Sequence, residues 1–189
     1  MKKKKIIIAI TGASGSIYAQ RLIKQLEKFD HLEVGIVMSK NAPDVWQQEI
    51  GEKPELSYPV YDRSDYRAPF ASGSARYMHM VIVPCSMGTL GRIAGGISDD
   101  LTTRSADVIL KERRQLICVV RDTPLNLIHL ENMVKVTRAG GIILPAIPSF
   151  YSRPDSIEAV VDTVVNRIVD QLGLSTESYR WGETDQAEY

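Results

Sequence analysis

Residues 11–16 combine glycine, alanine and hydroxyl side chains in the manner of a phosphate-binding turn. They read Thr-Gly-Ala-Ser-Gly-Ser, follow the apolar stretch 6–10 and lead into a stretch of helical pattern. Free backbone N–H groups at the start of a helix attract anions, and small residues let an anion approach the backbone. Such a turn can also serve only to pack a strand against a helix. Between a strand and a helix we favour the phosphate.

A second polar turn, residues 84–89, follows the apolar stretch 81–83. The hydroxyl groups of Ser86 and Thr89 can bond a phosphate or the edge of a ring system, and the Met87 side chain can lie against an aromatic face. Alternatively, one of the hydroxyl residues only caps the next helix. Because the carboxyl ends of parallel strands meet at one edge of a sheet, the two turns together favour a shared ligand site.

The identity of the ligand is predicted from what the turns lack. A dinucleotide site needs further glycines and an acidic residue after the second strand. This chain has Ser39 and Lys40 at that place. It also has no Walker A sequence. A mononucleotide with one terminal phosphate, such as FMN, therefore fits better than NAD.

Arg121 is the basic residue whose position in the chain favours a contact with a ligand. Arg121 follows the apolar stretch 116–120, which places it at the ligand end of a strand. Lys111, Arg167 and Tyr151 have ordinary surface or packing explanations when each is taken alone. Histidine, cysteine and acidic residues show no metal-site spacing, so we expect no metal.

The amino-acid composition limits the class of protein to which the chain can belong. The chain has 189 residues, 44% hydrophobic and 24% charged, with a formal net charge of +0, which indicates one globular domain with a real core. The charge balance gives no overall attraction to nucleic acid or an anionic membrane. The apolar stretch after Lys2–Lys5 is too short for a signal peptide or a membrane span. Cys85 and Cys118 follow apolar runs, which predicts buried reduced thiols and a cytoplasmic protein.

Short apolar stretches alternate with helical patterns along the chain. We expect strands at 6–10, 34–38, 81–83, 116–120 and 142–144, and helices at 16–29, 41–50, 89–96, 102–114, 125–139 and 157–172. The pair Thr123-Pro124 is expected to start the fifth helix. Continuous apolar strands are typical of sheets covered on both faces. The predicted fold class is therefore α/β, with a Rossmann-like, doubly wound, mostly parallel sheet and helices on both faces, a three-layer sandwich.

One domain is expected over residues 1–174, followed by a polar tail over residues 175–189. Residues 51–76 have little apolar content and are interpreted as a long loop that forms a site wall or a subunit contact. Trp181 predicts that the tail docks on the domain.

A set of short motifs, in this order and spacing, resembles the UbiX-type flavin prenyltransferases. The motifs are Gly12-Ala13-Ser14-Gly15, Ser39-Lys40, Pro84-Cys85-Ser86-Met87-Gly88-Thr89, Arg121-Asp122-Thr123-Pro124-Leu125, His129-Leu130-Glu131-Asn132-Met133 and Arg180-Trp181-Gly182. The resemblance covers essentially the whole chain. It implies an enzyme that joins the dimethylallyl group of dimethylallyl phosphate to N5 and C6 of reduced FMN. The product, prenylated FMN, would serve UbiD-type decarboxylases in ubiquinone synthesis or in the breakdown of aromatic acids.

The resemblance also implies site residues by motif. The FMN contacts would be Gly12, Ala13, Ser14, Ser39, Ser86, Met87, Gly88, Thr89 and Arg104. The prenyl phosphate contacts would be Lys111, Arg121, Tyr151, Arg167 and Trp181, with Glu49 and Asp122 as nearby carboxylates among the catalytic residues. Several would come from neighbouring subunits, because the family forms dodecamers.

One departure from the family pattern, the identity of the base and two alternative functions remain open. Asp122 stands where the family usually has glutamate, so the acid is kept with a reach shorter by one methylene. The base of the reaction is either a carboxylate such as Glu49 or the leaving phosphate. A flavin-dependent cysteine decarboxylase of the phosphopantothenoylcysteine type is the nearest other enzyme, although no histidine lies near the expected active-site loop. A noncatalytic FMN carrier would not need three cations beside the ring.

Overall fold

The computed structural model describes residues 3–180 and residue 182. Its sheet has the strand order β3-β2-β1-β4-β5-β6, and every neighbouring pair is parallel. The strands are β1 (Lys4–Ile10), β2 (Leu32–Met38), β3 (Val60–Tyr61), β4 (His79–Cys85), β5 (Gln115–Val120) and β6 (Ile142–Ile143). This is the strand order of the Rossmann fold, and it confirms the predicted doubly wound α/β class.

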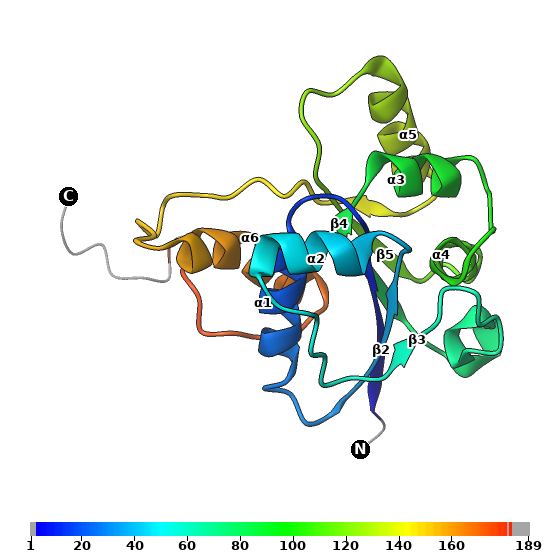
Figure 1. Ribbon diagram of the computed structural model, residues 1–189, viewed down its shortest axis with the longest axis horizontal. Helices are drawn as coiled ribbons and strands as arrows, with labels where there is room; N and C mark the ends of the chain where they lie inside the picture. Colours follow the sequence, from blue (N-terminus) through cyan, green and yellow to red (C-terminus); the bar gives the residue numbers. More distant parts are fainter. Residues whose placement is uncertain (1–2, 181, 183–189) are drawn as a thin grey trace.

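Helices cover both faces of the sheet, as predicted (Figure 1). They are α1 (Ser16–Leu26), α2 (Ala42–Ile50), α3 (Met87–Ala94), α4 (Leu101–Lys111), α5 (Leu127–Arg138) and α6 (Ile157–Gln171). The helices α1, α2 and α6 lie together on one face, and α4 lies on the other. Beyond the end of β4, α3 and α5 pack against each other.

Alternation along β1 explains why its sequence is apolar throughout. Ile6, Ile8 and Ile10 belong to the core beneath α1 and α6, whereas Ile7 and Ala9 belong to the core beneath α4. All five are at most 1% exposed. Successive side chains of a strand point to opposite faces, so a strand covered twice needs apolar residues at every position.

The fifth helix starts later than the sequence analysis predicted. Asn126, and not Thr123, is its N-cap, because the Asn126 side chain accepts a hydrogen bond from the His129 backbone N–H. Thr123 and Pro124 lie in the preceding loop. Asparagine is as good an N-cap as threonine. The N-cap propensity of Thr123 therefore could not decide where the helix begins.

Residues 51–76 are not the plain loop that was predicted. They contain the edge strand β3 and two 3₁₀ turns, η1 (Pro69–Ala71) and η2 (Gly73–Ala75). Phe70 is 1% exposed and its ring packs edge-on against Tyr61 and Tyr77. The segment is short of apolar residues, but this one buried ring ties it to the core beneath α4.

The start of the predicted tail is docked. Arg180 donates a hydrogen bond to Asp170 of α6 at 2.8 Å. Trp181, whose docking was predicted, lies outside the described residues. Among the helices of the described chain, none has the length and apolar character needed to cross a membrane.

Thr11 joins the carboxyl ends of the two central strands. Its hydroxyl donates to the Pro84 carbonyl at 2.6 Å and accepts from the Ser86 backbone N–H at 3.0 Å. The residue is 1% exposed. A single buried hydroxyl therefore satisfies a donor and an acceptor and fixes the two polar turns relative to each other.

Replacing this hydroxyl should destabilise the domain. Thr11→Val keeps the volume but leaves the Ser86 N–H and the Pro84 carbonyl without their partner, which should lower the free energy of unfolding by about 1–3 kcal/mol. Thr11→Ser keeps both hydrogen bonds and loses one methyl group, so it should be the more stable variant. Urea unfolding of the three proteins checks this. A valine variant as stable as wild type would contradict the role of the bridge.

Candidate functional site

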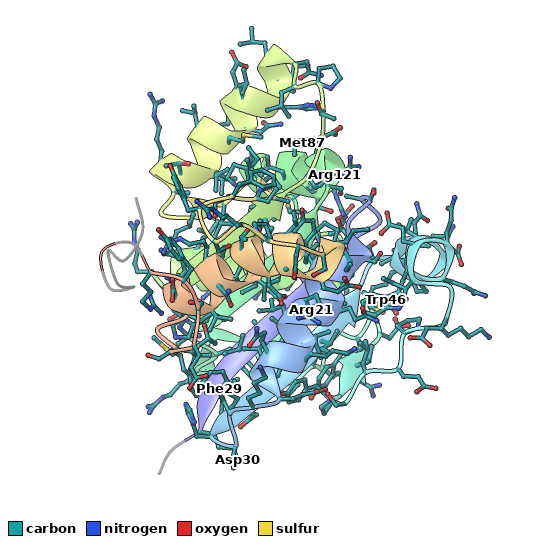
Figure 2. All side chains as sticks on the ribbon, turned by 90° about the vertical axis from the view of Figure 1, so that its left-hand side faces the viewer. Arg21, Phe29, Asp30, Trp46, Met87 and Arg121 are labelled. Atoms are coloured by element: carbon teal, nitrogen blue, oxygen red, sulfur yellow. The ribbon has the colours of Figure 1, made fainter. Side chains whose placement is uncertain are left out.

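The two polar turns meet where the chain changes direction in the sheet. β1 and β4 are neighbours, and the strands that follow them in sequence lie on opposite sides of this pair. Ligands of open α/β sheets bind in the crevice outside the carboxyl ends at such a switch point. Figure 2 shows Met87 and Arg121 at this end of the molecule and Phe29 and Asp30 at the other.

A cleft of about 540 Å³ opens at the carboxyl ends of β1, β2 and β4. Its walls are formed by Gly12, Ser39, Lys40, Asn41, Arg63, Ser86, Gly88, Thr89, Arg92 and Asp100. The structure thus brings five of the predicted FMN contacts into one cleft. Ala13, Ser14 and Met87 are adjacent to them in the same two turns.

The two glycines of this cleft have different surroundings. A Cβ atom on Gly88 would meet no atom within 4 Å. One on Gly12 would come within 3.0 Å of the Asn41 Cβ, so a side chain there would crowd the start of α2. Close approach of a ligand to the backbone is the physical reason for glycine in such turns.

The second turn caps a helix, as considered above, and its hydroxyl groups also line the cleft. The Ser86 hydroxyl accepts from the Thr89 N–H at 3.3 Å and is the N-cap of α3. The same hydroxyl lies 3.1 Å from the Thr89 hydroxyl in the wall of the cleft. Capping therefore fixes the orientation of the two hydroxyl groups that a ligand would meet.

An ion-pair network closes one wall of the cleft. Arg92 lies 2.8 Å from Asp99 and 2.9 Å from Asp100. Burial acts to raise the pKa of Asp100, but hydrogen bonds from Thr103 and Arg92 outweigh it and hold that pKa below its usual range. Asp100 and Thr103 also form the capping box of α4. The wall is therefore rigid, and Lys40 and Arg63 add positive charge to the lining.

Glu49 occupies part of the phosphate-binding turn. Its carboxylate accepts from the Gly15 N–H at 2.9 Å and the Ser16 N–H at 2.7 Å. Burial acts to raise the pKa of Glu49, but hydrogen bonds from Ser14, Gly15 and Ser16 outweigh it and lower that pKa. Two of the N–H groups expected to be available for a phosphate are thus already bonded within the chain.

Arg121 extends from the end of β5 towards α1. Its backbone N–H donates to the Cys85 carbonyl at 3.3 Å, and its side chain lies close enough to Tyr18 to influence that phenol. Burial raises the pKa of Tyr18, and the Arg121 charge opposes this. Within the described residues the Arg121 Nε atom is buried and has no hydrogen-bond partner. Such a donor is ready for a ligand acceptor.

Asp122 faces solvent beside this arginine. Its carboxylate accepts from the Thr123 N–H at 2.9 Å, and the residue is exposed. The shorter side chain is thus bonded to its own loop.

A second cavity, of about 680 Å³, lies along α6. It is lined by Ile147, Ser149, Tyr151, Ser152, Ala159, Thr163, Asn166, Arg167, Asp170, Ser178, Tyr179 and Arg180. Two predicted prenyl phosphate contacts, Tyr151 and Arg167, therefore share a cavity. The sequence analysis did not select Thr163 or Asp170, although their spacing from Arg167, four residues before and three after, places them on the same helix face.

Besides the three residues adjacent to the first cleft, five predicted site residues that the structure describes line neither cavity: Glu49, Arg104, Lys111, Arg121 and Asp122. Lys111 ends α4, which runs from the carboxyl edge of the sheet to the amino edge, and it pairs with Glu112 at 2.7 Å. Arg104 donates to the Ala71 carbonyl at 3.2 Å and pairs with Asp107 at 3.2 Å. Within one chain, Lys111 is therefore not brought to Arg121 and Arg167. In the described part of the chain, no cluster of three or more histidine, cysteine or acidic residues could hold a metal ion.

Comparisons with known proteins identify relatives of this chain and its fold. The family model described as Flavoprotein matches residues 1–170. A flavin prenyltransferase UbiX from Methanothermobacter thermautotrophicus is 44% identical over 181 residues, covering 94% of each chain.

Two solved structures agree with this relationship. A UbiX protein crystallised with FMN and dimethylallyl pyrophosphate has a TM-score of 0.92 and 41% identity, covering 97% of this chain and 100% of its own. A dodecameric, FMN-dependent UbiX-like decarboxylase from Escherichia coli O157:H7 has a TM-score of 0.88 and 37% identity, covering 94% of this chain and 98% of its own. This chain therefore belongs to the UbiX flavin prenyltransferases within the flavoprotein family.

Proposed function

We propose that this protein is a flavin prenyltransferase that transfers the dimethylallyl group of dimethylallyl phosphate to N5 and C6 of reduced FMN. The observation that carries the proposal is the near-complete structural match to a UbiX protein that holds FMN and a dimethylallyl ester together. The two cavities of this chain suit those two ligands. One lies at the switch point of the sheet, and the other contains Tyr151 and Arg167.

FMN fits the cleft at the ends of β1, β2 and β4. We assign its binding to the backbone at Gly12 and Gly88 and to the hydroxyl groups of Ser39, Ser86 and Thr89. When bound and reduced, FMN supplies the electron-rich N5 and C6 atoms that accept the prenyl group. The engagement of the Gly15 and Ser16 N–H groups by Glu49 favours a flavin phosphate nearer Ser39 and Lys40 than the start of α1.

The prenyl phosphate requires cations because negative charge grows on its oxygens as the C–O bond breaks. Arg167 and Tyr151 share the larger cavity, and Arg121 carries a buried Nε donor that lacks a partner within the described residues. The planar guanidinium suits two phosphate oxygens at once. We assign these residues to the phosphate, with Lys111 supplied by a neighbouring subunit.

The carboxylates have different surroundings. A group whose pKa is lowered is a weaker base near neutral pH. Glu49 is in this position, since the turn holds its carboxylate ionised. We therefore propose that Glu49 orders the turn, and that the leaving phosphate or Asp122 accepts the proton released when the second bond forms.

Assembly with further copies of the chain completes the proposal. Apolar side chains on the outer face of α5 are unusually exposed: Leu127 is 68%, Ile128 66% and Leu130 47% exposed. Burying such a surface favours association, and a dodecamer like that of the Escherichia coli O157:H7 protein is our proposal for this chain.

We propose further that the product goes to a UbiD-type decarboxylase. The buried free thiols Cys85 and Cys118 support a cytoplasmic location.

A direct assay separates this proposal from the alternatives. The protein is incubated with reduced FMN and dimethylallyl phosphate, and the flavin is analysed by mass spectrometry for the added prenyl group. A cysteine decarboxylase or an FMN carrier would return unmodified FMN.

The protein should bind FMN and not NAD. The turn at residues 11–16 lacks the dinucleotide glycines, and Ser39 and Lys40 stand where a ribose-binding acid would be. Titration with each ligand, followed by fluorescence or calorimetry, measures this. Tight NAD binding together with no FMN binding would show that the cleft is assigned to the wrong nucleotide.

Arg121→Ala and Arg167→Ala should each impair prenyl transfer far more than FMN binding. A donor aimed at the leaving phosphate stabilises the transition state more than the ground state. Its removal should cost about 2–4 kcal/mol, roughly thirtyfold to a thousandfold in rate. FMN titration and single-turnover product formation are compared for each variant. Equal losses in both would place the arginines at the flavin phosphate, and no loss would place them outside the site.

Glu49→Gln should remove a pH-dependent contribution to stability. Because the pKa of Glu49 is lowered in the folded protein, its contribution is present above the unfolded value and is lost as pH falls through the folded value. The stability gap between wild type and variant should thus close below about pH 4.5. Urea unfolding at pH 6 and below pH 4 tests this, with Glu52→Gln, an exposed carboxylate just past α2, as the control. A constant gap would refute the ionised cap.

A further inference from the structure

The Asp170 carboxylate joins two arginines from different segments in the wall of the larger cavity. One oxygen accepts from Arg167 at 3.0 Å, and the other accepts from Arg180 at 2.8 Å. The Asp170 side chain is 17% exposed, whereas that of Arg167 is 65% exposed. The most buried of the three groups is therefore the carboxylate between the cations.

Helix α6 fixes the position of this carboxylate. Thr163, Asn166, Arg167 and Asp170 follow helical spacing and line the cavity. The opposite face of the helix is buried in the core beneath α1 and α6 through side chains that are at most 4% exposed: Val161, Val164, Val165, Ile168 and Val169. Because that face is packed, the position of the Asp170 backbone is set by the core.

Two separate segments of the cavity wall are attached to this one helix face. The loop that carries Tyr151 is attached by the Ser149 N–H, which donates to the Thr163 hydroxyl at 3.1 Å. The C-terminal segment, residues 175–180, is attached through Arg180 and Asp170. Arg167 lies between the two attachments. The cavity thus depends on polar bonds from α6 to segments that have few buried residues of their own.

The net charge of this site and the number of its N–H donors suit an anionic ligand. Two guanidinium groups and one carboxylate leave a net positive charge at this site. In the described part of the chain, the Arg167 guanidinium bonds only Asp170 and does so through one nitrogen, although a guanidinium carries five N–H donors. The carboxylate therefore restricts the rotamers of an exposed arginine while leaving donors for a phosphate.

We propose that Asp170 is a positioning residue for the prenyl-transfer reaction. It holds Arg167 in the orientation that binds the prenyl phosphate, and through Arg180 it holds the C-terminal segment over the same cavity. Phosphate binding and the order of residues 175–180 are therefore coupled. This inference rests on the proposed function and assigns a role to a residue outside the motifs that carry the family resemblance.

The test compares Asp170→Asn with wild type in three measurements. The amide keeps the shape but loses the charge and one acceptor oxygen, so the KM for dimethylallyl phosphate should rise at least about tenfold. The Kd for FMN should stay within about twofold of wild type, because the flavin cleft is separate. Amide hydrogen exchange of residues 175–180 should become faster and should no longer slow when dimethylallyl phosphate is added with FMN.

Two further variants define the role. Asp170→Glu retains the charge on a longer side chain and should recover part of the lost affinity and protection. Asp162→Asn removes an ion pair of the same helix, that with Arg21, without lining the cavity. It should lower stability while leaving the KM and the exchange of the C-terminal segment unchanged.

The outcomes separate this inference from the proposed function. An unchanged KM and unchanged exchange in Asp170→Asn, with wild type active, would overturn the inference alone. A lower KM would also overturn it, because Asp170 would then compete with the phosphate for Arg167. If wild type forms no prenylated FMN, the proposed function fails, and the exchange comparison still decides whether Asp170 holds the segment.

Discussion

The hydrogen bonds of the Thr11 hydroxyl connect the carboxyl ends of β1 and β4, and the rest of the site is arranged around this connection. The turn after β1 and the turn after β4 belong to distant parts of the sequence. Neither could form a ligand cleft alone, because each supplies only one wall. The buried hydroxyl fixes both walls at the place where the strand order reverses, so the cleft exists before any ligand enters. Preformed donors of this kind bind a ligand without a further ordering cost.

The second constraint on the site is a set of carboxylates that accept hydrogen bonds from donors of the same chain. Glu49 engages the start of α1, Asp100 engages Arg92 and Thr103, and Asp170 engages Arg167 and Arg180. A site for two phosphorylated ligands needs positive groups, but unpartnered cations close together would repel one another and sample many rotamers. Carboxylates held in place between the cations reduce both the repulsion and the number of rotamers. They also explain why a chain with a formal net charge of +0 can present local anion sites.

The sequence predicted those features that depend on local periodicity. The alternation of apolar strands and helices determined the fold class, and the small residues of 11–16 and 84–89 indicated the cleft. Features that depend on one distant contact were not predictable in this way. Phe70 anchors an otherwise polar segment through Tyr61 and Tyr77, and nothing in its neighbours signals this. The role of Asp170 was not predicted, since the sequence does not show that Arg180 returns to it. Lys111 is named by family resemblance, and its place in one chain gives no reason to select it.

The two cavities differ in what holds them, and this difference suits the two ligands proposed for them. The cleft proposed for FMN is built from strand ends and helix starts that are continuous with the core, so its shape is set by the folding of the domain. The larger cavity is completed by the loop around Tyr151 and by residues 175–180, whose attachments to α6 include the bonds from Ser149 to Thr163 and from Arg180 to Asp170. A flavin with a rigid ring suits a preformed cleft. A small phosphate ester must enter, react and leave its phosphate behind, and this needs walls that can open at little energetic cost. The packed face of α6 therefore supports the outer walls of this cavity from a helix that belongs to the core.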